Sequence, residues 1–74
     1  MNTEFQAYNG RGDGEFERDY GELQGSSFEH VIAQIQERWE VDDIKQIFIV
    51  DVEAGEARLF DVVPQPGFAL AQVA

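Results

Sequence analysis

Residues 25–40 read GSSFEHVIAQIQERWE, and this stretch decides the fold of the 74-residue chain. Its apolar side chains recur at spacings of three and four, which places them on one face of an α-helix. They are Phe28, Val31, Ile32, Ile35 and Trp39. Ser26 and Glu29 match a capping box, in which each side chain bonds to an unpaired backbone N–H of the first turn. The pattern predicts one amphipathic helix over residues 27–40.

The residues before this helix predict a β-hairpin. Residues 3–8 and 15–23 alternate between polar and apolar side chains, as strands with one buried face do. The glycine-rich stretch 9–14 between them predicts a flexible turn. Gly21 is expected to end the regular alternation or to mark a bulge.

The residues after the helix predict a second hairpin. Residues 44–52 and 57–63 are rich in β-branched and aromatic side chains, and the turn between them contains Gly55. The two prolines at 64 and 66 are expected to end regular structure. The order predicts the α+β class, with a single ββαββ domain at residues 1–66. In that domain a four-stranded antiparallel sheet carries the amphipathic helix on one face.

The apolar side chains of the second hairpin lie on both faces of the predicted sheet. We expect the helix to cover Phe48, Val50, Val52, Phe60 and Val62. One helix covers one face, so the other face needs a cover as well. The apolar tail, residues 67–74, is expected to pack on the sheet, to lie at a dimer interface or to be disordered. Candidate contacts of the second face or of a dimer are Ile47, Ile49, Leu59, Phe68 and Leu70, with Val63 on the same face.

Charge and composition exclude several functions. The chain carries 15 acidic and five basic residues, a net charge of −10, so direct binding to nucleic acid is not expected. It has no cysteine, which excludes disulfides, thiolate zinc sites and a cysteine nucleophile. The N-terminal residues lack the basic and apolar regions of a signal peptide, and no apolar run is long enough to span a bilayer. We therefore expect a cytoplasmic protein with no membrane partner.

Motifs for catalysis and metal binding are incomplete. The residues from Asn9 to Tyr20 resemble a calcium loop in part, but Arg11 and Tyr20 occupy ligand positions. His30 is the one histidine, and Ser26 is assigned to the helix cap. We expect no enzyme activity and no cofactor or metal.

The acidic residues of the first hairpin are the best candidate for a binding site. On a strand, Glu15, Glu17 and Asp19 project from one face about 6.6–6.8 Å apart, with Glu4 and Glu22 nearby. Such a row can occupy a basic groove that normally holds nucleic-acid backbone. The alternative is a solvated sheet edge whose charges prevent aggregation.

Two functions follow as hypotheses. The first is a protein-binding inhibitor of a basic, nucleic-acid-binding partner. In size and charge the chain is similar to the small acidic phage proteins that inhibit CRISPR and restriction systems, although no sequence motif carries this likeness. The second is a homodimeric structural or regulatory domain whose acidity serves only solubility.

Overall fold

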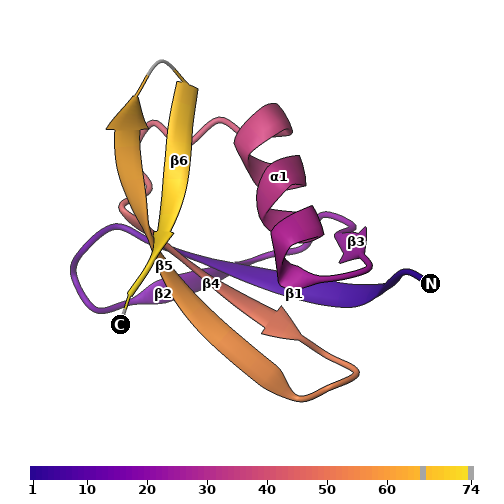
Figure 1. The fold of residues 1–74 in the computed structure, drawn as a ribbon. Helices are drawn as coiled ribbons and strands as arrows, with labels where there is room; N and C mark the ends of the chain where they lie inside the picture. Colours follow the sequence, from indigo (N-terminus) through magenta and orange to yellow (C-terminus); the bar gives the residue numbers. More distant parts are fainter. Residues whose placement is uncertain (66, 74) are drawn as a thin grey trace.

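The computed structural model of the protein describes residues 1–65 and 67–73 (Figure 1). The chain forms one helix and six strands in these residues, and every strand pair is antiparallel. The elements are β1 (Thr3–Gly10), β2 (Phe16–Asp19), β3 (Gln24–Gly25), α1 (Phe28–Arg38), β4 (Gln46–Asp51), β5 (Glu56–Gln65) and β6 (Gly67–Gln72). The predicted α+β class, with one helix packed on an antiparallel sheet, is confirmed. The predicted number of four strands is wrong. Pro66, the predicted last residue of the domain, and Ala74 lie outside the described residues.

The strands lie in the order β2-β1-β4-β5-β6, and β3 pairs with the start of β1. The predicted strand 15–23 is therefore shorter in the structure, where β2 ends at Asp19 and an irregular segment leads to β3. Gly25 lies six positions after Asp19, whereas their partners on β1 are only four positions apart, so this segment has two residues more than the part of β1 beside it. The backbone N–H of Gly21 bonds to Asp19 Oδ1 at 2.8 Å, which confirms the expected break at this glycine.

The irregular segment adds one side chain to the core. The carbonyl of Leu23 accepts a hydrogen bond from the backbone N–H of Phe5, and both of these residues are buried. Because the strand breaks at Gly21, Leu23 lies in the core instead of in a regular strand.

Helix α1 begins one residue later than the sequence pattern indicates. Ser27 is the N-cap, and its hydroxyl accepts the N–H of His30 at 3.2 Å. The N–H of Ser26 bonds instead to His30 Nδ1 at 3.1 Å. The predicted cap at Ser26 with Glu29 is therefore wrong by one position, because Ser27 accepts the N–H of His30 while the His30 ring, in place of a glutamate, accepts the N–H of Ser26.

The predicted faces of β4 are reversed. Ile47 and Ile49 are fully buried in the core with Val31 and Ile35 of the helix, whereas Phe48 and Val50 lie on the other side of the sheet. Each residue of an antiparallel ladder shares a face with its direct partner, and Ile47 pairs with the buried Phe60. All four residues of the run Ile47–Val50 are apolar, so the sequence does not show which two of them face the helix. A shift of the pairing by one residue would exchange the two faces of the strand.

The remaining face predictions have mixed outcomes. Phe60 and Val62 contribute to the core, as expected, while Val52 is exposed at the end of the hairpin. Leu59 pairs with Phe48 and lies on the face opposite the helix, which confirms its placement there.

The predicted tail is a sixth strand. Strand β6 pairs with β5, so that Leu70 lies opposite Val62 and Phe68 opposite Pro64. Phe68 and Leu70 pack against the hydrophobic core. Their predicted place on the second face is therefore wrong, because the tail extends the sheet and turns these side chains toward the helix.

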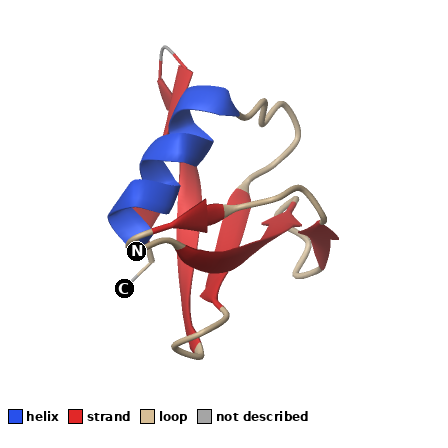
Figure 2. Cartoon of the chain, turned by 90° about the vertical axis from the view of Figure 1, so that its right-hand side faces the viewer, coloured by secondary structure: helices blue, strands red, loops and turns tan. Residues whose placement is uncertain are grey.

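The helix stands between the two ends of the curved sheet, with β6 on one side and β3 on the other (Figures 1 and 2). Gln34 Nε2 donates to the carbonyl of Gln24 on β3 at 2.7 Å. Gln36 Oε1 accepts the backbone N–H of Leu70 on β6 at 2.8 Å. Two positions on a helix differ by about 200°, so these side chains point in opposite directions. The helix therefore hydrogen-bonds to a backbone group of β3 on one side and of β6 on the other.

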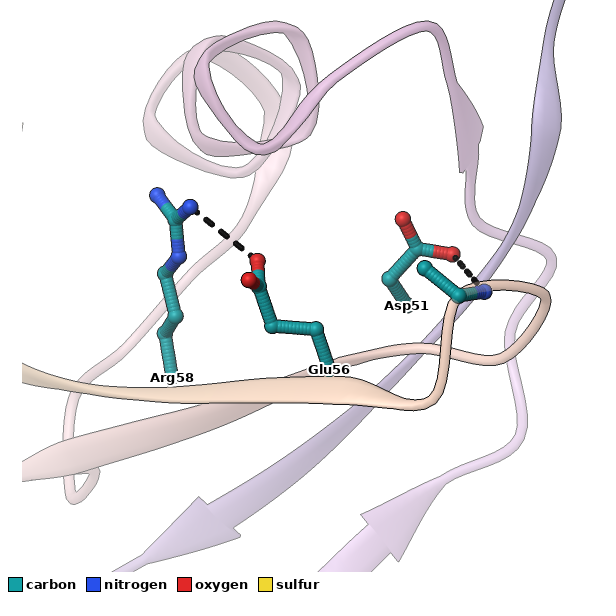
Figure 3. A network of polar contacts seen from close by, with 4 residues as sticks. Asp51, Glu56 and Arg58 are labelled. Carbon is teal, nitrogen blue, oxygen red and sulfur yellow. Dashed lines mark hydrogen bonds and ion pairs between the residues drawn. The ribbon is translucent and has the colours of Figure 1, made fainter.

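The start of the helix is held by aromatic and charged contacts. The rings of Phe5 and Phe28 meet edge to face at 5.3 Å, and Arg58 Cζ lies 4.2 Å from the centre of the Phe28 ring. Arg58 also forms an ion pair with Glu56 at 3.0 Å (Figure 3). Nearby, Asp51 Oδ1 accepts the N–H of Ala54 and shapes the hairpin turn. These contacts lie on the side of the sheet that the helix covers.

Candidate partner-binding surface

The turn between β1 and β2 brings carboxylates together. Gly12 and Gly14 have φ angles of 88° and 86°, in the left-handed region that favours glycine. Asp13 Oδ1 accepts the backbone N–H of Glu15 at 3.0 Å, which fixes this carboxylate beside the start of β2. The glycine-rich composition thus has a structural role, because it allows the chain to turn tightly around Asp13.

A groove of about 400 Å³ lies beside this turn, and we call it the acidic groove. It is lined by Asn9, Arg11, Asp13, Glu15, Phe16, Glu17 and Ile44. Three carboxylates and one guanidinium give this lining a net charge of −2 at neutral pH. The apolar wall formed by Phe16 and Ile44 lowers the effective dielectric constant next to the carboxylates, which strengthens electrostatic interactions inside the groove. The groove therefore favours a cationic group.

Asn9 lines the acidic groove and also carries a buried side-chain oxygen. Its Oδ1 is buried and has no hydrogen-bond donor within the described residues. Asn9 lies directly opposite Glu17 in the ladder between β1 and β2. A buried acceptor without a partner is unfavourable by about 1–3 kcal/mol, so this position carries a cost to the stability of the fold.

The predicted acidic row is divided between two sites. Glu15 lies just before β2 and Glu17 within it, and both line the acidic groove. Asp19 lies at the end of β2 and lines a second hollow of about 180 Å³, together with Glu4 and Glu22. Asp19 is half-buried and already accepts the N–H of Gly21, whereas Glu15 and Glu17 are exposed. The break after Asp19 is the physical reason for this division.

Few of the carboxylates are neutralised by the protein itself. Across residues 1–65 and 67–73, the one ion pair joins Arg58 to Glu56, on the other hairpin (Figure 3). The five acidic residues singled out from the sequence take no part in it. Their charge is therefore directed to solvent or to a partner.

An exposed apolar area covers the other side of the sheet, which we call the outer face. Tyr8, Phe16, Phe48 and Val50 line a hollow of about 340 Å³ there, and we call it the apolar hollow. The ring of Phe48 lies 6.4 Å from that of Tyr8 and 6.3 Å from that of Phe16. Phe16 is 39% exposed. Of the second-face residues expected from the sequence, Leu59 lies on this side, and Val63 shares its row of β5.

Three residues of these surfaces were missed in the sequence. The sequence places Asn9 and Asp13 in a turn and an incomplete calcium loop, and Phe16 on the apolar side of a strand, and assigns none of them to a binding surface. An aromatic residue in an otherwise charged strand, directly after a turn with an acidic residue, is the signal that could have indicated them.

Two further kinds of site are absent from the part of the chain that the structure describes. No group of three or more His, Cys, Asp or Glu side chains in it is arranged to hold a metal ion. No helix in these residues has both the length and the hydropathy needed to cross a membrane.

Comparison of the chain with protein-family models, with curated proteins and with solved structures found no match. Its function is therefore argued from its own residues.

Proposed function

We propose that this protein is a non-enzymatic inhibitor that binds a basic, nucleic-acid-binding surface of another protein. The acidic groove supports this proposal most directly, because it concentrates Asp13, Glu15 and Glu17 in one lining beside an apolar wall. Cationic side chains that normally contact phosphates are the groups that such a groove would accept. The biological setting that suits such an inhibitor is a phage or mobile element acting against a CRISPR or restriction system.

The net charge of −10 supports the same function at longer range. A strongly acidic protein is drawn toward a basic surface before contact, and this attraction raises the association rate. At about 0.15 M ionic strength the attraction is screened beyond roughly 8 Å. Binding should therefore weaken steeply as salt is added.

Competition with nucleic acid tests the proposal. Purified CRISPR effectors and restriction enzymes are incubated with the protein and then titrated with labelled target DNA. We expect the protein to weaken DNA binding by a target enzyme. The paired reversal Glu15→Lys with Glu17→Lys should abolish this effect while the circular dichroism spectrum remains native.

The matched control is the pair Glu37→Lys with Glu40→Lys. These residues are exposed at the end of the helix, outside both acidic hollows, and their reversal changes the net charge equally. If the control pair abolishes inhibition as fully as the groove pair, total charge acts rather than the groove. If inhibition survives reversal of Glu15 and Glu17, the groove is not the binding site.

A second candidate function rests on the outer face. Its exposed apolar side chains could support a homodimer whose acidity serves only solubility. Sedimentation equilibrium distinguishes the two functions. A dimer at micromolar concentration that dissociates on Phe48→Ser would favour the homodimeric domain, and a monomer would favour the inhibitor.

A further inference from the structure

The acidic groove and the apolar hollow share one side chain. Phe16 lines both of them, and its ring separates the charged site from the apolar one. Its position is fixed by pairing with Gly10, where an added Cβ would lie 2.7 Å from the Phe16 ring. A ligand that fills the groove at Phe16 is therefore already in reach of the outer face.

The apolar hollow has the composition of a pocket for one apolar side chain. The residues that line it are aromatic or aliphatic, and the two ring contacts of Phe48 define its walls. Arg18 lies in the same row of the outer face, opposite Tyr8, but its guanidinium lies 4.8 Å from the ring centre of Tyr20. Arg18 does not line the hollow, so no charge opposes an apolar group there.

We propose that the apolar hollow receives an apolar side chain of the same basic partner that occupies the acidic groove. The partner's epitope then combines a cationic side chain with a neighbouring large apolar one, and the two straddle the Phe16 ring. This inference rests on the proposed function, and it adds the chemical class of the epitope. Buried aromatic anchors carry much of the binding energy in protein interfaces, whereas charge contributes mainly to rate and specificity.

Charge argues against a second copy of the chain as the occupant. Asp61 shares a row of the outer face with Phe16 through Gly10 and Gln46, so stacking of two outer faces would place this carboxylate of each copy at the apolar contact. Each copy also carries a net charge of −10. A basic partner meets none of this repulsion.

Two arginine-rich hexapeptides of equal charge test the inference. One carries tryptophan at its second and fourth positions, and the other carries serine there. Their affinities for the full chain are measured by nuclear magnetic resonance titration, which also maps the amides that shift. We expect the tryptophan peptide to bind at least tenfold more tightly. We also expect its shifts to extend from the acidic groove to Phe48 and Val50, whereas those of the serine peptide stay within the groove.

Matched variants test whether the apolar hollow causes the difference in affinity between the two peptides. Val50→Thr replaces one methyl group of the hollow by a hydroxyl at nearly constant volume, and Val52→Thr makes the same change outside it. The tryptophan advantage should fall at least threefold in the first variant and persist in the second. An equal loss in both variants would overturn the inference.

The remaining outcomes distinguish a failure of this inference from a failure of the proposed inhibitor function. If both peptides bind equally through the groove, the inference fails and the inhibitor function stands. If neither peptide binds, both fail. If the tryptophan peptide binds as tightly after reversal of Glu15 and Glu17, the hollow is independent of the groove and the combined epitope is wrong.

Discussion

The reversal of faces on β4 leads to the sharpest prediction about stability. Ile49 and Val50 are neighbours on the same strand, yet Ile49 is fully buried under the helix and Val50 is half-buried on the outer face. Truncation of a buried isoleucine to alanine destabilises a protein by about 2–5 kcal/mol, through lost burial and a residual cavity. Each buried methyl group contributes about 0.8 kcal/mol, so the two methyls removed from a half-buried valine contribute about 1 kcal/mol or less.

These magnitudes are large for a domain of this size. At about 0.05–0.15 kcal/mol per residue, a chain of 74 residues has a free energy of unfolding of roughly 4–11 kcal/mol. Ile49→Ala should therefore remove a large part of the stability. For a small domain each kcal/mol lowers Tm by about 4–8 °C, so Ile49→Ala should lower Tm by about 10 °C or more and Val50→Ala by about 5 °C.

Urea denaturation measures this difference. Trp39, the one tryptophan, packs partly buried against the core at the end of α1, and its fluorescence reports unfolding. Far-ultraviolet circular dichroism provides a second signal for the same transition. Equal losses in the two variants, or a larger loss for Val50→Ala, would show that the helix covers the opposite face of the sheet.

Three further predictions concern the helix and its contacts. Ser27→Ala should reduce the free energy of unfolding by about 1 kcal/mol, and Ser26→Ala by less, in urea titrations, because the hydroxyl of Ser27 caps α1. Gln36→Ala should accelerate amide hydrogen exchange at Leu70, whose N–H loses its acceptor, with a stability loss of about 1 kcal/mol. Gly25→Ala should lower stability by about 1–3 kcal/mol, because the added Cβ would lie 2.7 Å from a methyl group of the buried helix face, and a native Tm in this variant would contradict that close approach.

The sequence predicts the elements of this fold better than their faces. The period of the apolar residues in α1 is strong enough to place the helix to within two residues at its end. The run Ile47–Val50 is apolar at every position, so its period gives a strand but not the face that meets the helix. That face is decided by pairing with Ala7 and Phe60, which are distant in sequence.

The candidate site is also only partly predictable, because local alternation gives the side of a strand but not how the neighbouring turn closes. Glu15 and Glu17 are two positions apart, so their shared side of the strand follows from the alternation alone. Asp19 follows the same alternation, but the break at Gly21 places it in another hollow. The buried acceptor of Asn9 and the shared position of Phe16 depend on how the turn closes, which local sequence does not determine.

The most direct test of the proposed inhibitor is its affinity for a target enzyme as a function of salt, with and without the groove reversal. The protein and the Glu15→Lys, Glu17→Lys variant are titrated into that enzyme between about 0.05 and 0.5 M NaCl, a range over which screening shortens from roughly 14 to 4 Å. We expect the wild-type affinity to fall at least tenfold across this range, and the variant to bind weakly throughout. Equal affinities of the two proteins at every salt concentration would contradict the role of the acidic groove.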